Sequence, residues 1–89
     1  MLFAIIGKLK VPAKQAIARR VNWKYPTGIR VVGEYWVNSN DATLIVIAEA
    51  ENDGALLSYR VDWDDDFEID VYPAMTAEHG LQVAKQLAA

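Results

Sequence analysis

Residues 29–50 read IRVVGEYWVNSNDATLIVIAEA, and this stretch decides the fold. Both ends of it are rich in β-branched and aromatic residues, which favour strands. The NSND segment between them contains residues that tolerate tight turns. The pattern predicts a two-stranded antiparallel hairpin, with Val37 paired to Ala42 and Arg30 opposite Glu49. The Arg30–Glu49 pair supports this register, because opposite charges attract across neighbouring strands.

Both faces of the predicted hairpin are apolar. The run from Leu44 to Ala48 does not alternate apolar with polar residues, as a strand with one solvated face would. We therefore expect this strand to be central in a sheet and covered on both sides. The small residues Gly33 and Ala48 indicate the face that meets the helices of the chain. The apolar residues expected on the opposite, uncovered face are Val32, Trp36, Ile45, Ile47 and either Phe3 or Ile5.

The rest of the chain predicts a β-α-β-β-α-β order followed by one more helix. Residues 2–10 form an apolar strand, and residues 12–23 form a helix that a proline begins. Asn52 caps the second helix. Residues 67–72 alternate as an edge strand, and Thr76 caps the last helix. Right-handed crossovers turn this order into an α+β, ferredoxin-like antiparallel sheet with strand order 4-1-3-2, two helices on one face and a C-terminal helix.

Helical spacing predicts which residues of the first two helices are buried. In the first helix these residues are Ala13, Ala16, Ile17 and Val21. In the second helix they are Leu56, Leu57 and Val61, flanked by Tyr59 and Trp63.

The composition indicates a single domain over residues 1–89, because 53% of the residues are hydrophobic and the chain is short. The chain has no cysteine, which excludes disulfides and thiolate chemistry. No apolar run approaches the roughly 20 residues that span a bilayer, and the first residues lack the pattern of a signal peptide. We therefore expect a cytoplasmic protein that does not associate with membranes.

The net charge of −3 is unevenly distributed along the chain. Every basic residue except Arg60 and Lys85 precedes Glu34, which is the first acidic residue. We expect the basic and acidic parts to neutralise each other in the fold. The alternative is a basic patch on the first helix that attracts an anionic ligand. A sequence pI of about 4.9 argues against binding to nucleic acid.

No motif of the sequence indicates a metal or a cofactor. His79 is the only histidine and is interpreted as a solvated residue of the last helix. The acidic residues between Asp62 and Asp70 lack the glycine and glutamate positions of an EF-hand loop. The chain contains no phosphate-binding glycine loop and no dinucleotide fingerprint.

The chain is rich in large aromatic residues, which are candidates for a binding site. They are Trp23, Tyr25, Tyr35, Trp36, Tyr59, Trp63 and Tyr72. The first interpretation is that they fill a small core and an interface, where each buries a large area. The alternative is an aromatic pocket between sheet and helices, with Glu34, Arg30 or Asp70 as its polar groups.

Several segments resemble a small family catalogued as a domain of unknown function, number thirty-three-oh-three. They are the initial MLF, the GEYW arm, the IVIAEAENDGAL stretch, Trp63 and the FEIDVYPAM strand. The family belongs with the dimeric α+β barrels, and the order of elements is also similar to that of the muconolactone isomerases. The resemblance implies a sheet-to-sheet homodimer. Some members of that superfamily are cofactor-free monooxygenases or isomerases, and others bind haem. In the family a histidine often follows the tryptophan of the second strand, whereas here Val37 follows Trp36, which lowers the expectation of catalysis.

Two classes of function follow. The first is a homodimeric binding or structural module without its own chemistry, paired through the helix-free sheet faces. The second is a cofactor-independent isomerase or monooxygenase that acts on a small aromatic or cyclic compound. For the second class, Glu34 or Asp70 would accept a proton and Tyr35 or Tyr72 would donate one. Trp36 and Arg30 are the residues expected to bind a ligand.

Overall fold

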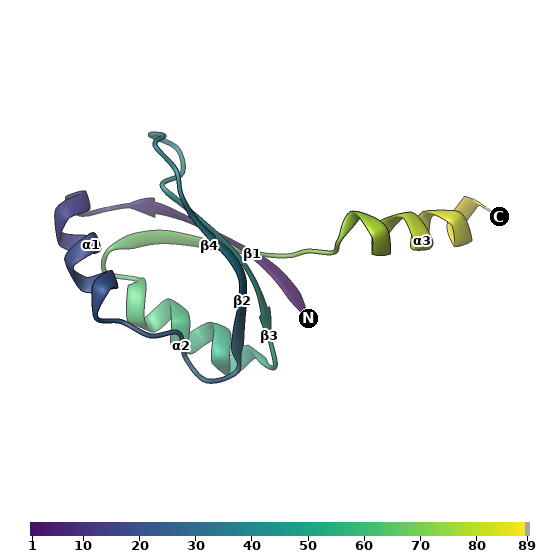
Figure 1. The fold of residues 1–89 in the computed structure, drawn as a ribbon, viewed down its shortest axis with the longest axis horizontal. Helices are drawn as coiled ribbons and strands as arrows, with labels where there is room; N and C mark the ends of the chain where they lie inside the picture. Colours follow the sequence, from purple (N-terminus) through teal and green to yellow (C-terminus); the bar gives the residue numbers. More distant parts are fainter. Residues whose placement is uncertain (89) are drawn as a thin grey trace.

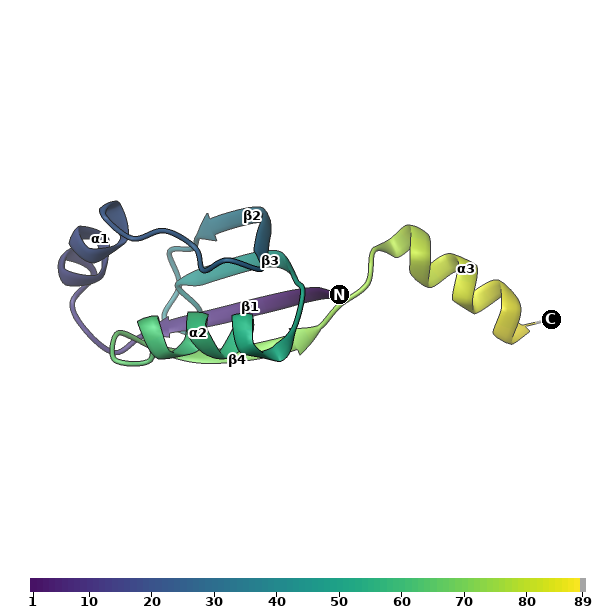
Figure 2. The same cartoon turned by 90° about the horizontal axis from the view of Figure 1, so that it is seen from below.

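The computed structural model describes residues 1–88 as a four-stranded antiparallel sheet with two helices against one face and a third helix beyond it (Figure 1, Figure 2). Residue 89, the last of the predicted domain 1–89, lies outside the described residues. The elements in chain order are β1 (Leu2–Leu9), α1 (Ala13–Val21), β2 (Ile29–Trp36), β3 (Leu44–Ala50), α2 (Asp53–Trp63), β4 (Phe67–Pro73) and α3 (Ala77–Ala88).

The strand order is β2-β3-β1-β4, which is the predicted order read from the other edge. The two central strands are β1 and β3, the strands with the densest apolar content on both faces. Ile5 of β1 pairs with Val46 of β3 on one side and with Val71 of β4 on the other. The predicted α+β, ferredoxin-like fold with a C-terminal helix is therefore confirmed.

The predicted hairpin register is confirmed at the beginning of β2. Arg30 pairs with Glu49 and Val31 pairs with Ala48. The Arg30 guanidinium lies 2.8 Å from the Glu49 carboxylate. Both side chains are exposed, so this ion pair defines the register more than it stabilises the fold.

A β-bulge at Val32 shifts the register over the rest of β2. Beyond the bulge, Glu34 pairs with Val46 and Trp36 pairs with Leu44. Because side chains alternate between faces, a shift of one residue moves every following side chain to the other face. The prediction that Trp36 lies on the uncovered face was therefore wrong, and both Glu34 and Trp36 point towards the helices.

The core lies between the sheet and the two packed helices. Ile5 and Val46 are fully buried, with 0% of their surface exposed. Helix α2 contributes Tyr59 and Trp63 to the core, and the buried residue of α1 is Ala16.

The predicted buried faces of the helices were partly wrong. The predicted residues that are exposed are Ala13, Ile17 and Val21 of α1 and Leu57 and Val61 of α2. In α2, a stripe of residues 55, 59 and 63 turns inward instead, because two aromatic rings bury more area than Leu57 and Val61 would. In α1, Ile17 borders a cavity and so has no neighbouring side chain to cover it. The helix also ends at Val21, two residues before the predicted end.

The face of the sheet away from α1 and α2 carries no helix in the described structure (Figure 1). Gly33, which was predicted on the helix side, lies on this face because of the bulge. Phe3 and Ile5 were the candidates for this face, but both lie on the inner face, opposite the buried residues Ala48 and Val46. The apolar and aromatic residues on the helix-free face are Leu2, Ala4, Ile6, Tyr35, Ile45, Ile47 and Tyr72, with the bulged residue Val32 exposed beside them.

Ion pairs among residues 1–88 join the basic and acidic parts of the chain in part. Each of the three described pairs joins an arginine among the first 30 residues to an acid that follows. The pairs are Arg19–Asp66 at 3.4 Å, Arg20–Glu34 at 2.9 Å and Arg30–Glu49 at 2.8 Å.

The last helix, α3, extends away from the sheet (Figure 1, Figure 2). The Thr76 hydroxyl accepts a hydrogen bond from the backbone N–H of His79 at 3.1 Å, which confirms the predicted cap. Leu81 and Leu87 are exposed, and none of the helix residues described is buried. Within residues 1–88, no helix has the length and apolar character needed to cross a bilayer.

Candidate functional site

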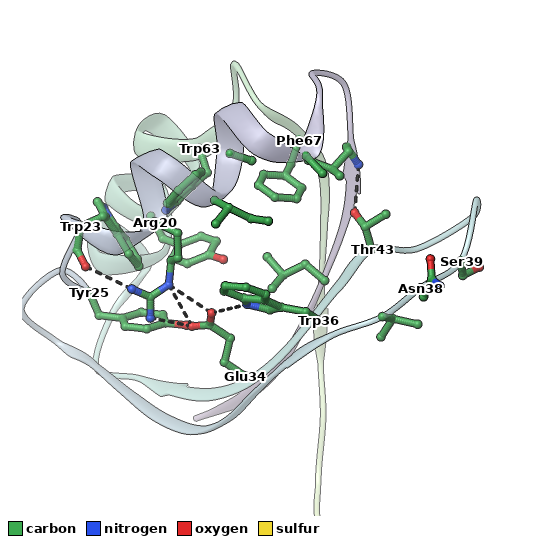
Figure 3. Close-up of a pocket in the computed structure, with 17 residues that line it drawn as sticks. Arg20, Trp23, Tyr25, Glu34, Trp36, Asn38, Ser39, Thr43, Trp63 and Phe67 are labelled. Atoms are coloured by element: carbon green, nitrogen blue, oxygen red, sulfur yellow. Dashed lines mark hydrogen bonds and ion pairs between the residues drawn. The ribbon is translucent and has the colours of Figure 1, made fainter.

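An open cavity of about 220 Å³ lies between the inner face of the sheet and the helices α1 and α2 (Figure 3). Six aromatic side chains form most of its wall. They are Trp23, Tyr25, Trp36, Tyr59, Trp63 and Phe67. Arg20 and Glu34 are the charged side chains of the lining. A concave, mostly apolar site with a few convergent polar groups is the usual form of a small-molecule pocket.

Glu34 is the centre of the polar part of this cavity. Figure 3 shows Arg20, Tyr25 and Trp36 converging on its carboxylate. Its Oε1 accepts hydrogen bonds from Arg20 Nη2 at 2.9 Å and from the Tyr25 hydroxyl. Its Oε2 accepts hydrogen bonds from Trp36 Nε1 at 2.8 Å and from Arg20 Nε at 3.1 Å. The carboxylate is therefore engaged at both oxygens.

Local structure explains how these groups meet. Arg20 lies in the last turn of α1, and Tyr25 follows in the segment that leads to β2. Glu34 and Trp36 lie beyond the bulge, two residues apart on the same face of β2. The bulge therefore brings the carboxylate of an edge strand to the end of a helix.

The hydrogen bonds set the protonation states in the cluster. Burial alone would raise the pKa of Glu34, but hydrogen bonds from Arg20, Tyr25 and Trp36 lower it below its ordinary value of 4.5. The hydrogen bond to Glu34 raises the pKa of Arg20. Burial, followed by the hydrogen bond to Glu34, strongly raises the pKa of Tyr25. At neutral pH the cluster therefore contains a carboxylate, a guanidinium cation and a neutral phenol.

Trp23 joins the aromatic side chains of the wall. Its ring lies edge-on to those of Tyr25 and Trp63, with centroids 4.6 and 5.3 Å apart. Its indole N–H donates a hydrogen bond to Asp62 Oδ2 at 2.9 Å. Edge-to-face packing of this kind adds about 0.5–1.5 kcal/mol per pair beyond the buried area. Trp23 is consequently packed within a cluster of aromatic rings.

Tyr59 of α2 differs from the other polar members of the wall. Only 2% of its surface is exposed, and burial raises its pKa to about 12. In the part of the chain that the structure describes, its hydroxyl has no hydrogen-bond partner. This hydroxyl belongs to a residue that lines the cavity.

The structure brings two of the predicted site residues, Glu34 and Trp36, into the cavity. The other catalytic candidates, Asp70, Tyr35 and Tyr72, lie on the helix-free face of the sheet. Their side chains cannot reach a ligand in the cavity, because the sheet lies between.

The predicted ligand-binding residue Arg30 is also outside the cavity. It pairs with Glu49 on the helix-free face, and hydrogen bonding to Arg30 lowers the pKa of that carboxyl. Arg30 and Glu49 instead border a separate shallow depression near the N-terminus.

Sequence reasoning did not identify the hydrogen-bond donors Arg20 and Tyr25, although Tyr25 was among the aromatic candidates. Arg20 was considered only as part of a basic surface on the first helix. The signal that could have found the cluster is Gly33, since a glycine inside a strand often marks a bulge. A bulge beside Gly33 would have turned Glu34 towards the end of the first helix.

His79 is exposed in the first turn of α3, away from the cavity. Among the residues that the structure describes, no group of three or more histidine, aspartate or glutamate side chains could hold a metal ion.

The fold and the cavity together define a ferredoxin-like α+β domain with an aromatic pocket between its sheet and its helices. The family described as Domain of unknown function (DUF3303) matches residues 1–88, and the chain belongs to this family. The resemblance of the sequence to this one family is therefore confirmed. No curated protein and no solved structure matches the chain.

Proposed function

We propose that this protein is a binding module that holds a small, mostly apolar molecule in the cavity lined by Trp36 and Glu34. The observation that carries this proposal is the Glu34 carboxylate, which three side chains engage within an aromatic wall. A carboxylate held in this way shapes and orients a pocket, and it is a poor proton acceptor.

The protonation state of Glu34 supports binding over catalysis. A general base works best when its pKa lies near the working pH. The pKa of Glu34 is lowered from 4.5, so the carboxylate is a weak base at neutral pH. The strongly raised pKa of Tyr25 makes that phenol a weak acid.

The experiment is a titration with acetophenone and with ethylbenzene, two neutral one-ring compounds that fit a cavity of this size. We expect binding of at least one compound to shift the indole N–H resonances of Trp36 and Trp63. Ala16 is buried beside the cavity, and Ala16→Leu should weaken binding about tenfold, because the larger side chain takes up space that a ligand would fill. The control is Ala18→Leu, at an exposed position of the same helix. Failure of both compounds to bind would contradict the proposal.

A cofactor-independent isomerase or monooxygenase is the second candidate, and one observation favours it. The cavity places a carboxylate and a phenol side by side, and these are the groups of a proton transfer. A substrate that draws Arg20 away from Glu34 would free the base. In that case Glu34→Gln abolishes turnover of a small cyclic compound while the variant remains folded and still binds it. Unchanged turnover would exclude Glu34 as the base.

We also propose that the protein forms a homodimer through the helix-free sheet faces, as the dimeric α+β barrels do. The support is the apolar surface that this face exposes, which includes Val32 and Tyr35. A contiguous apolar patch of more than a few hundred Å² is unusual on a monomer. Light scattering should give a mass close to twice the 9.9 kDa of one chain, and a mass near 9.9 kDa would contradict the proposal.

A further inference from the structure

The charges of the cavity neutralise each other and leave none for a ligand. Arg20 and Glu34, the charged side chains of its described lining, form an ion pair at 2.9 Å. Both carboxylate oxygens are engaged, and the guanidinium also donates to the Trp23 carbonyl at 3.2 Å. A charged ligand would therefore lose its hydration without gaining a free partner, which is costly in an apolar site. The cavity is suited to an uncharged molecule.

Most polar hydrogens of the wall already have acceptors. The indole N–H of Trp36 and the hydroxyl of Tyr25 donate to Glu34. The indole N–H of Trp23 donates to Asp62, and the Thr43 hydroxyl donates to a backbone carbonyl. These groups would have to break an existing bond before they could bind a ligand.

The Tyr59 hydroxyl is the exception on the inner wall. Its residue is 98% buried, and it has no hydrogen-bond partner within residues 1–88. Among the described residues, the polar side-chain atom that is fully closed off without a hydrogen-bond partner is Asp66 Oδ2, so the Tyr59 oxygen is not closed off. Since Tyr59 lines the cavity, its hydroxyl is open to a ligand there without breaking an existing hydrogen bond. At neutral pH the phenol is protonated, so it can donate to an acceptor.

The size and shape of the cavity limit the rest of the ligand. An empty cavity of about 150 Å³ is large enough for benzene. The volume of about 220 Å³ therefore accommodates one aromatic ring with a short substituent, or two small fused rings. Aromatic walls formed by Trp23, Trp36 and Trp63 favour a flat molecule, because flat rings stack on them or pack against their edges.

We propose that the ligand is an uncharged aromatic molecule with a carbonyl oxygen that accepts a hydrogen bond from the Tyr59 hydroxyl. This inference rests on the proposed binding function and adds the chemical class of the ligand and the residue that recognises it.

The test compares acetophenone with ethylbenzene, which has nearly the same shape but no acceptor, and with benzoate, which is an anion. Wild-type protein should bind acetophenone and should bind benzoate more weakly. Tyr59→Phe keeps the ring and removes the hydroxyl. It should weaken acetophenone binding about fivefold, the usual contribution of one neutral hydrogen bond, and leave ethylbenzene binding unchanged. Tyr72→Phe removes a hydroxyl on the opposite face of the sheet and should change neither affinity.

A second measurement observes the hydrogen bond itself, first in the wild-type protein and then in the two variants. The infrared carbonyl stretch of bound acetophenone should lie at a lower frequency than in an alkane, because a donated hydrogen bond weakens the C=O bond. This shift should persist in Tyr72→Phe and disappear in Tyr59→Phe.

The outcomes separate this inference from the binding function. Equal loss of affinity for acetophenone and ethylbenzene in Tyr59→Phe would overturn the inference, because the residue would then be only structural. Unchanged acetophenone affinity, an unshifted carbonyl stretch in the wild type, or tighter binding of benzoate would also overturn it, while the pocket itself would stand. Binding of neither neutral compound to the wild type would contradict the binding function, and this inference with it.

Discussion

Each oxygen of the Glu34 carboxylate accepts hydrogen bonds from two different side chains, so one residue joins α1, the segment that follows it and β2. Its side chain is only 15% exposed. Hydrogen bonds to an ionised group are roughly twice as strong as neutral ones. Glu34 therefore holds Tyr25 and Trp36 in place as parts of the pocket wall.

The first prediction concerns the pH dependence of stability. The pKa of Glu34 is lowered in the folded protein, so the stability that the carboxylate contributes is present above 4.5 and is lost as the pH falls below that value, through the folded-state pKa. Glu34→Gln should lower the unfolding free energy by about 1 kcal/mol at pH 7. The difference from the wild type should shrink at pH 3, as measured by urea denaturation.

The control for this variant is Glu68→Gln. Glu68 lies on β4 with an exposed side chain on the helix-free face. Its substitution should leave the unfolding free energy within about 0.5 kcal/mol of the wild type. A Glu34→Gln deficit that is equally large at pH 7 and pH 3 would show that the charge of Glu34 does not cause it.

At the scale of elements, β2 shows how far the sequence could predict the site. Glu34 and Trp36 were identified as candidates because a carboxylate and an indole are the groups that bind ligands. Their face was predicted wrongly, because strict alternation assumes that no residue is inserted into the ladder. The bulge at Val32 depends on the local twist of the strand and on the packing of the Tyr35 ring. A pattern of residue types predicts neither of these. The Tyr35 ring lies over Gly33, and a Cβ there would be 2.5 Å from the Tyr35 hydroxyl oxygen.

The helices also show which features the sequence could predict and which it could not. Their existence and their caps could be predicted, because the signals at Asn52 and Thr76 are local, and both caps are present. The buried face of α1 was predicted correctly only at Ala16, because the rest of that face depends on a cavity built by distant parts of the chain. Periodicity assumes a solid core beneath every apolar stripe, and Ile17 faces open space instead.

The second prediction concerns α3. This helix extends away from the sheet and has no buried residue among those described (Figure 2). A variant that ends at Thr76 should therefore keep the thermal stability of the sheet and its two packed helices. Its unfolding midpoint should lie within about 2 °C of that of the full chain, because no core contact is lost. Circular dichroism melting would measure this. A decrease of about 5 °C or more would show that α3 is covered by another surface in solution.

At the scale of the whole molecule, the two faces of the sheet differ in how they are covered. The inner face carries the core and the pocket, whereas the outer face exposes Tyr35, Tyr72 and Val32. The sequence predicted this difference, because β1 and β3 are apolar on both faces and two helices cover only one. The pattern of residue types does not determine the shape of the outer surface. The geometry in which the sheets of two chains would pack therefore could not be predicted from the sequence.

The third prediction tests the proposed dimer. Ile47 lies on the outer face of the central strand β3. Ile47→Asp would bury a charge in the proposed interface, which is strongly unfavourable. It should reduce the mass measured by light scattering from about twice 9.9 kDa to 9.9 kDa. The control is Val61→Asp, at an exposed position on α2, which should leave the mass unchanged. An unchanged mass for Ile47→Asp would place the interface elsewhere.

The central position of β1 has a consequence for the order in which the domain is built on the ribosome. β1 is synthesised before every other element of the domain, yet its partners β3 and β4 begin at Leu44 and Phe67. The β2–β3 hairpin closes a short loop and can form as soon as it emerges, because local contacts form first. β1 must wait unpaired until β3 has been made, and its other edge stays open to association with other nascent chains until β4 follows. The first strand of the domain to be made is therefore paired on both edges only when the last strand has been made.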